Sequence, residues 1–284
     1  FVSREMLSKL NEDIQIPEIN TLLDPENPQI ETLIPDVYSI LEDDSYNEDG
    51  QVGHLNKATE LLKLEFLSSA SLEIEAGSSE IEENPTGILE ISTLFLQSND
   101  YANSIRIIYK NFSRLKSRLN EPYIDYLYYL YYPYGYKKLV LKYSNTYNLN
   151  PLFTLAIIRQ ESSFMPDAGS YAGAQGLLQI IPSTGKSIAN QIGLENFNDS
   201  MLLDPEISIN MGTFYLRQQL DNFNQSKIYC LGAYNGGPGA MSDWISRWGD
   251  KDTEEFIENI PYNETRDYIK KVMGNYYFYQ MLYD

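Results

Sequence analysis

Any acid–base chemistry in this sequence must rely on carboxylates. The 284 residues include one histidine, His54, and one cysteine, Cys230. A histidine-based nucleophile triad therefore has a single candidate base, and a tetrahedral zinc site of Cys and His ligands is nearly excluded. Because 40 residues are Asp or Glu, the question is which carboxylate has the setting of a catalytic group.

Glu161 has the setting that a general acid needs. Asn150 followed by Pro151 is a typical helix start, and no breaker follows before Glu161, which predicts this carboxylate in the last helical turn. Phe153, Ile157 and Glu161 share one helix face. Loss of water and the negative end of the helix dipole would both raise its pKa toward neutral pH. A solvent-exposed glutamate at a helix end fits the same spacing equally well.

The stretch after this helix has the composition of a binding wall. Glycines at 169, 173 and 176 permit positive φ or close backbone approach, while Ser170 and Gln179 are uncharged hydrogen-bonding residues that suit a neutral sugar. The stretch lacks the Lys-Ser/Thr ending of a phosphate-binding loop. We therefore interpret it as part of a ligand site rather than as a simple connection.

The elements around this region are predicted to be mainly α-helical. Residues 1–55 are acidic and carry four prolines, which predicts short helices joined by flexible connections. Residues 56–131 show apolar positions at helical spacing, broken by turn residues, which predicts α-helical hairpins; a superhelical stack is one arrangement that they allow. Residues 132–284 contain Glu161 and form the third predicted domain.

Charge divides the chain in a similar way. The formal net charge is −19; residues 1–100 hold 22 acidic and 4 basic side chains, and residues 101–284 hold 18 and 17. Such a balance argues against a broad grip on nucleic acid or anionic lipid. The basic side chains concentrate in one region, as Arg106, Lys110, Arg114, Lys116, Arg118, Lys137, Lys138 and Lys142. Pairing with the acidic N-terminal segment would account for them.

No targeting segment and no membrane-spanning segment is predicted. The longest uncharged run, residues 168–185, contains four glycines and a proline. Such a run cannot form a transmembrane helix. The acidic N-terminal segment is expected to serve solubility or to contact a protein partner.

Three blocks of sequence occur in order in the C-terminal half. The first is residues 158–164 (IRQESSF) with residues 173–184 (GAQGLLQIIPST), the second is residues 233–239 (AYNGGPG), and the third is residues 260–268 (IPYNETRDY). Together they resemble the catalytic domain of soluble lytic transglycosylases, lysozyme-like enzymes that cleave peptidoglycan. The resemblance implies a lysozyme-like α-helical domain from Tyr132 to the C-terminus.

The resemblance assigns a role to each matching position. Glu161 corresponds to the single catalytic acid/base of the family. The positions that match substrate-binding residues are Ser162, Ser170, Gln179, Ile181, Tyr234, Asn235, Glu264 and Tyr268. Leu178 and Ile181 replace a common Met, and Gly236 replaces a common Ala, which affects the fine-tuning toward substrate rather than the chemistry.

Several of these residues also have structural interpretations. Tyr234 could be a packing residue, and residues 235–239 could be a helix-breaking turn. Glu264 fits a first-turn acid of a helix as well as it fits a site residue. Met241, Trp244, Ile245 and Trp248 follow helical spacing, which predicts a helix core rather than sugar platforms.

The resemblance implies cleavage of the bond between N-acetylmuramic acid and N-acetylglucosamine in peptidoglycan, with 1,6-anhydro ends as products and with no metal or cofactor. One well-placed carboxylate fits substrate assistance by the N-acetyl group better than a two-carboxylate mechanism. The alternatives are a goose-type lysozyme, which adds water, and a non-catalytic peptidoglycan-binding or assembly protein on the same fold. The substrate implies the periplasm or cell envelope, and the oligomeric state and exo or endo cleavage stay open.

Overall fold

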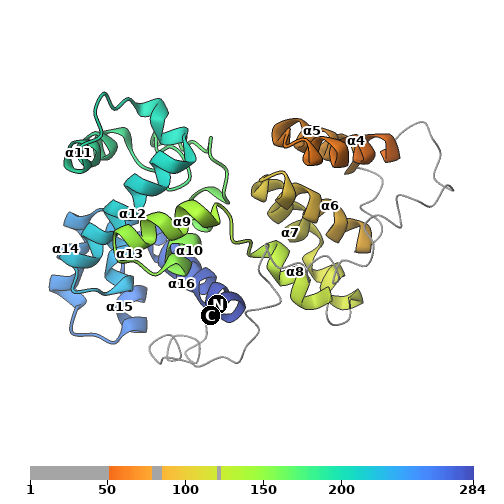
Figure 1. Ribbon diagram of the computed structural model, residues 1–284. Helices are drawn as coiled ribbons and strands as arrows, with labels where there is room; N and C mark the ends of the chain where they lie inside the picture. The colour runs from red at the N-terminus through yellow and green to blue at the C-terminus, as the bar shows by residue number, and fades with distance from the viewer. Residues whose placement is uncertain (1–50, 79–84, 120–122) are drawn as a thin grey trace. The chain divides into compact units, whose positions relative to one another are not determined.

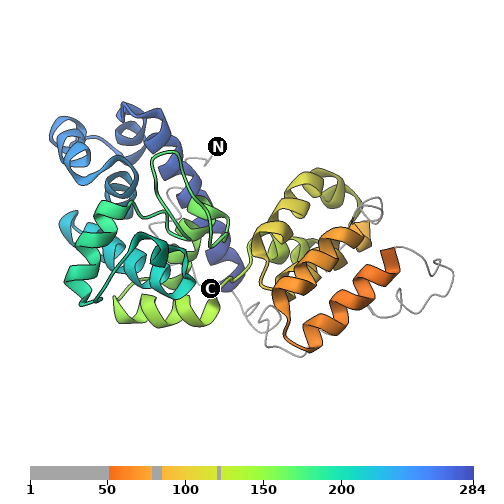
Figure 2. The same cartoon turned by 90° about the horizontal axis from the view of Figure 1, so that it is seen from above.

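The computed structural model describes residues 51–78, 85–119 and 123–284 (Figures 1 and 2). These residues form helices joined by connecting segments, and they contain no β-strand. Two isolated β-bridges join residue 169 to 175 and residue 175 to 180. The predicted mainly α fold is confirmed. The described chain forms two compact units, one of residues 136–281 and the other of residues up to Gly135 together with 282–284.

The N-terminal unit consists of helices that pack on their neighbours in sequence. They are α4 (Gln51–Lys63), α5 (Leu67–Gly77), α6 (Pro85–Gln97), α7 (Tyr101–Arg118) and α8 (Tyr123–Tyr131). Three residues link α4 to α5 and three link α6 to α7, so each pair packs as an antiparallel hairpin. The predicted helical hairpins are confirmed in the described part of this region, although the first helix begins at Gln51 rather than after residue 55.

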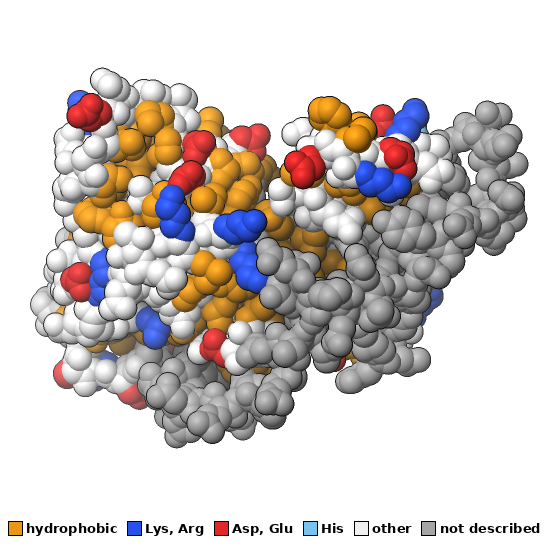
Figure 3. Space-filling model, in the orientation of Figure 1, with side chains coloured by type: hydrophobic (Ala, Val, Ile, Leu, Met, Phe, Trp, Pro, Cys, Tyr) orange, Lys and Arg blue, Asp and Glu red, His pale blue; other side chains and the backbone are white. Residues whose placement is uncertain are grey.

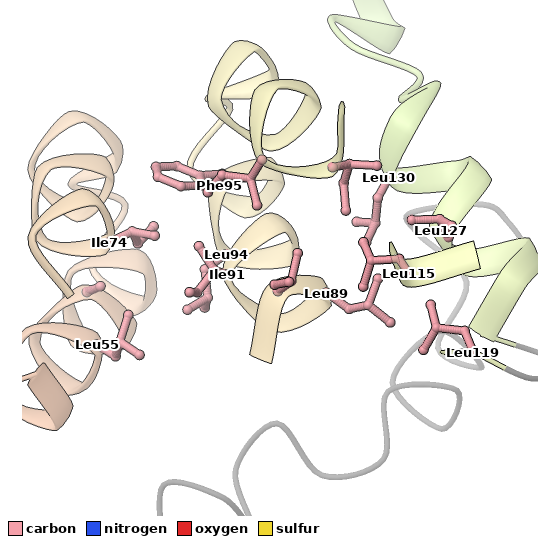
Figure 4. Packing of buried hydrophobic residues seen from close by; sticks show 14 residues of the cluster. Leu55, Ile74, Leu89, Ile91, Leu94, Phe95, Leu115, Leu119, Leu127 and Leu130 are labelled. Atoms are coloured by element: carbon pink, nitrogen blue, oxygen red, sulfur yellow. The ribbon is translucent and has the colours of Figure 1, made fainter. Parts of the chain in front are cut away.

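Aliphatic side chains from all five helices form one core in this unit (Figure 4). Ile74 of α5, Ile91 of α6 and Leu115 of α7 have almost no exposed surface. Burial of each such side chain stabilises the unit by about 1.5–3 kcal/mol. The hairpins therefore form a folded body of their own.

The predicted division into three domains stays a prediction. Residues 1–50, which hold most of the predicted acidic segment, lie outside the described residues. The two units divide between Gly135 and Tyr136, whereas the predicted C-terminal domain begins at residue 132.

The C-terminal unit surrounds one buried helix. Its elements are α9 (Lys137–Thr146), α10 (Pro151–Ser162), α11 (Pro182–Ile192), the 3-10 helix η3 (Asp199–Leu203), α12 (Pro205–Asn222), α13 (Lys227–Gly236), α14 (Pro238–Trp248), α15 (Thr253–Asn259) and α16 (Asn263–Tyr283). Every residue of α10 from Leu152 to Arg159 is buried. The Phe153 ring packs edge-on against Tyr276 of α16. Helix α16 is the long dark-blue helix of Figure 2.

Both ends of α10 are determined by local chemistry. The Asn150 side chain accepts the backbone N–H of Leu152 at 2.8 Å, and Pro151 takes the first position, as predicted. At the other end Ser163 and Phe164 adopt left-handed backbone conformations, with φ of 50° and 67°. Such a pair cannot continue a right-handed helix, so the chain turns away directly after Glu161 and Ser162.

The segment after α10 is positioned by close backbone packing. Gly173 and Gly176 have φ of 79° and 78°, so the predicted use of glycine for positive φ is confirmed at these two positions. Gly169 does not have a positive φ. A Cβ atom at Gly176 would overlap the carbonyl oxygen of Leu202, and one at Gly212 of α12 would lie 2.6 Å from the Cβ of Leu178. Only glycine allows η3 and α12 to approach the segment this closely.

Replacing Gly212 by Ala should therefore destabilise the C-terminal unit. The added methyl group pushes Leu178 out of its packed position, and overpacking of this kind costs about 1–3 kcal/mol. Urea unfolding followed by circular dichroism measures the change. Gly239→Ala is the matched control, since a Cβ there meets nothing within 4 Å. Equal stability of the two variants would contradict this account of the packing.

Candidate active site

Glu161 lies in the last turn of α10 and contacts a tyrosine from a distant helix. The Tyr268 hydroxyl of α16 donates a hydrogen bond to Oε1 of Glu161 at 2.6 Å, across 107 residues of sequence. Tyr268 is buried, with 5% of its surface exposed, while Glu161 keeps part of its surface accessible. The carboxyl group is thus held in a defined orientation at a point that a ligand can reach.

The surroundings of Glu161 favour its protonated form. Burial raises the pKa of Glu161 to about 7, and the negative charge of Glu264 acts in the same direction. The hydrogen bond from Tyr268 acts in the opposite direction because it stabilises the carboxylate, but burial has the larger effect. A carboxyl group with this pKa can both give and take a proton near neutral pH.

Tyr234 is a second tyrosine near this carboxyl group, and it is partly buried. Its hydroxyl donates to the carbonyl oxygen of Leu178 at 2.6 Å, which joins α13 to the segment after α10. Burial and the charge of Glu161 raise the pKa values of Tyr234 and Tyr268 well above their ordinary range. Both phenols therefore stay protonated and act as donors. The hydrogen bond to Leu178 supports the packing interpretation of Tyr234, and its predicted contact with substrate stays a prediction.

Ser170 and Gln179 hold the shape of the loop between α10 and α11. The Ser170 hydroxyl accepts the backbone N–H of Ala174 at 3.0 Å, and the turn that they close is exposed. The Gln179 amide donates to the carbonyl oxygens of Ala168 and Gly176 at 3.0 and 2.9 Å. In this structure neither side chain is hydrogen-bonded to Glu161, so their predicted contacts with substrate stay a prediction.

Ser162 faces the protein interior. Ser162 is 8% exposed, and its hydroxyl donates to the carbonyl oxygens of Ile158 and Leu177, at 3.1 and 3.0 Å. The serine beside Glu161 therefore ties the end of α10 to the following segment. Its position gives no support to the predicted contact with substrate.

Asn235 is oriented by Thr265, a residue that the sequence did not single out. The Thr265 hydroxyl, on a residue that is 2% exposed, donates to Oδ1 of Asn235 at 2.6 Å. The amide nitrogen of Asn235 is thereby turned away from Thr265. The sequence could have pointed to Thr265, because it lies three residues before Tyr268 and positions i and i+3 share one helix face.

The packing around Asn235 and Thr265 also explains why position 236 is a glycine. A Cβ atom at this position would lie 2.8 Å from the Trp244 ring and 3.1 Å from the Thr265 hydroxyl. The glycine that replaces the common alanine therefore makes room for a buried tryptophan. Met241 and Trp244 are buried, which confirms the predicted helix core for these two residues, whereas Ile245 and Trp248 are only partly buried.

Besides Ser170, the exposed members of the predicted set are Glu264 and Ile181. Glu264 lies in the first turn of α16, where a carboxylate suits the helix dipole, and its charge reaches Glu161. The helix-end and site interpretations of Glu264 are therefore compatible. Ile181 precedes α11 and is 45% exposed, a large value for an aliphatic side chain. Both side chains are free to contact a ligand.

The structure also bears on metal and membrane binding within its described residues. In residues 51–78, 85–119 and 123–284, no three His, Cys, Asp or Glu side chains are placed together to hold a metal ion. Over the same ranges, no helix combines the length and the apolar character needed to cross a bilayer.

Comparisons with known proteins address the region that contains this site. Residues 138–257 match the family model described as the transglycosylase SLT domain. Over 154 residues the chain is 36% identical to the soluble lytic murein transglycosylase of Escherichia coli strain K12, which covers 53% of this chain and 24% of that protein. The membrane-bound lytic murein transglycosylase C of Actinobacillus pleuropneumoniae is 32% identical over 158 residues, or 48% of this chain and 43% of that protein.

A solved structure resembles more of the chain. The crystal structure of the 70 kDa soluble lytic transglycosylase from Escherichia coli has a TM-score of 0.66 and 26% identity, and covers 80% of this chain and 35% of that one. The chain thus spans about a quarter of the length of the first curated relative and about a third of this solved structure.

Stability should depend on pH through Glu161. The folded state holds a proton that the unfolded state releases near the ordinary pKa of 4.5, so the free energy of unfolding should fall as pH rises from about 4.5 to about 7. Glu161→Gln removes this effect. Between about pH 4.5 and pH 8, we expect the free energy of unfolding of the variant to rise by about 1–3 kcal/mol relative to that of the wild type. Urea unfolding at both pH values measures the gain, and a constant difference would contradict it.

Proposed function

We propose that this chain is a lytic transglycosylase of peptidoglycan, on the premise that its residues 138–257 form a lysozyme-like transglycosylase SLT domain. The resemblance that the three sequence blocks indicated is confirmed for this domain. The observation that carries the proposal is the setting of Glu161, a partly accessible carboxyl group with a pKa of about 7 and a fixed hydrogen-bond partner.

The first step of the proposed reaction uses Glu161 as an acid. Its proton passes to the oxygen that links N-acetylmuramic acid to N-acetylglucosamine, and the bond from that oxygen to C1 of the muramic residue breaks. The N-acetyl oxygen of the same muramic residue stabilises the positive charge at C1. A second protein carboxylate is not required for this step, in contrast to the usual pair in glycosidases.

The second step uses Glu161 as a base. The carboxylate takes the proton from the 6-hydroxyl of the muramic residue, and that oxygen bonds to C1 to close a 1,6-anhydro ring. The proton lost in the first step is thereby recovered, and no water is consumed. Tyr268, which donates to one oxygen of Glu161, orients the carboxyl group and stabilises its ionised form between the two steps.

A hydrolase on the same site is the competing function. Glu264 is a second carboxylate whose charge reaches Glu161, so it could serve as the base that an inverting glycosidase needs to activate water. The products differ by one water molecule. Glu264→Gln would abolish hydrolysis of this kind, whereas the lyase would retain cleavage.

The cellular location is proposed from the substrate. The relatives are named as soluble or membrane-bound lytic murein transglycosylases, so we propose that this chain also acts in the periplasm or cell envelope. Contact of the acidic N-terminal residues with an envelope protein belongs to the same proposal.

Digestion of purified sacculi tests the proposed function. We expect the wild-type chain to release fragments whose muramic ends are lighter by one water molecule than hydrated ends, as measured by mass spectrometry. Glu161→Gln should abolish release because the acid is lost, while its circular dichroism spectrum stays that of the wild type. Hydrated ends would favour the hydrolase, and binding without cleavage by the wild type would favour a non-catalytic protein.

Tyr268→Phe should change both the rate and its pH dependence. Without the hydrogen bond the carboxyl group is less well oriented, so we expect kcat to fall by about tenfold to a hundredfold. The same loss raises the pKa of Glu161, because the bond stabilises the carboxylate. The limb on which kcat/KM falls with rising pH should therefore move to higher pH. Tyr277→Phe on the same helix is the control, and an unmoved limb in Tyr268→Phe would argue against this role.

A further inference from the structure

Helix α7 of the N-terminal unit carries charge of one sign. Its basic residues are Arg106, Lys110, Arg114, Lys116 and Arg118, and its sequence from Tyr101 to Arg118 contains no Asp or Glu. The whole chain has a formal charge of −19, so this helix differs in sign from the average of the protein.

Six of the seven exposed side chains of α7 lie on one face, and Arg118 is exposed outside it. Arg106, Tyr109, Lys110, Ser113, Lys116 and Ser117 are exposed and follow the spacing of successive helical turns. We call these six residues the α7 outer face. The opposite side of the helix carries Ile105, Ile108 and Leu115, which are buried. The outer face is therefore a continuous row of cations, hydroxyl groups and one aromatic ring.

Among residues 51–78, 85–119 and 123–284, few side chains neutralise this row. Arg106 approaches Glu75 of α5 only to 3.9 Å, and about half of each side chain is exposed. Lys116 donates to the Tyr128 hydroxyl at 3.2 Å, which removes no charge. Lys110 forms no ion pair with any other described residue. The positive charge of the face is therefore available to a ligand.

Tyr109 adds a flat apolar surface to the cationic row. Its side chain is 70% exposed, a high value for tyrosine. The ring is nearly parallel to that of Tyr131 at 6.5 Å between centroids, and Tyr131 contacts Phe112 at 5.3 Å. An aromatic ring supported in this way suits the carbon–hydrogen face of a sugar, and its hydroxyl group remains in water.

We propose that the α7 outer face is an accessory binding surface for peptidoglycan, outside the catalytic unit. This inference rests on the proposed function for the choice of polymer. The peptide stems of peptidoglycan carry carboxylates, which match the cations of the face, and its sugar rings match Tyr109.

The surface would act by raising local substrate concentration. A polymer held on one unit is presented to the other at an effective concentration set by their linkage, so weak contacts on α7 increase retention on the cell wall without any contact to Glu161. The surface should therefore change binding to long, insoluble strands while turnover of a short soluble glycan stays the same.

Two double variants of the full-length chain test the proposal. Lys110→Gln/Lys116→Gln removes two cations from the α7 outer face, and Lys57→Gln/Lys63→Gln removes two exposed cations from α4 of the same unit. Each pair is combined with Glu161→Gln so that the sacculi stay intact, and binding is measured by co-sedimentation. We expect the apparent Kd to rise by about threefold to tenfold for the α7 pair only, at low salt.

Further arms separate charge, sugar and catalysis. Sacculi with amidated carboxylates should bind the wild-type surface and the α7 variant equally, and Tyr109→Ser should weaken binding at every salt concentration. With Glu161 intact, the α7 variant should turn over a short soluble glycan at the wild-type rate. If the wild type itself shows no turnover, the proposed function is refuted, but the binding result can still be interpreted. Equal sacculus binding by the two double variants would overturn the inference, as expected if the chain's own acidic residues 1–50 cover the face.

Discussion

The C-terminal unit depends on keeping one carboxyl group partly out of water at the end of a buried helix. Burial disfavours the ionised form of Glu161 more strongly than the Tyr268 hydrogen bond favours it, which leaves its pKa at about 7. An exposed glutamate would be ionised at neutral pH and could not donate a proton. The unfavourable burial is tolerated because α10 is buried from Leu152 to Arg159, and this packing fixes the position of the helix.

Four contacts from different elements converge on the segment that follows Glu161. Ser162 bonds to the carbonyl oxygen of Leu177, Tyr234 bonds to that of Leu178, and Gly176 and Gly212 leave room for η3 and α12. Residues 176–178 are therefore held both by backbone hydrogen bonds and by the buried side chains of Leu177 and Leu178. Much of the sequence resemblance in this region records close packing rather than contact with a ligand.

The two units differ in what their surfaces offer. The face of the C-terminal unit in Figure 3 shows charged side chains scattered singly or in small groups among hydrophobic and neutral polar ones. Strong charge of either sign near Glu161 would move its pKa away from neutrality, so a balanced surface suits this unit. The N-terminal unit has no such constraint, and α7 can concentrate cations on one face. The two proposals thus place binding of an anionic polymer and proton transfer in separate units.

The sequence by itself determined the helical class, the start of α10 at Asn150 and Pro151, and the place of Glu161 in its last turn, because capping and periodicity act within a few residues. The order of the three blocks indicated the domain. Only the tertiary structure decided that Tyr268 reaches Glu161, that Ser162 turns inward and that Thr265 orients Asn235. These contacts join residues far apart in the chain, or depend on which helix face is covered, and local spacing carries no information about either.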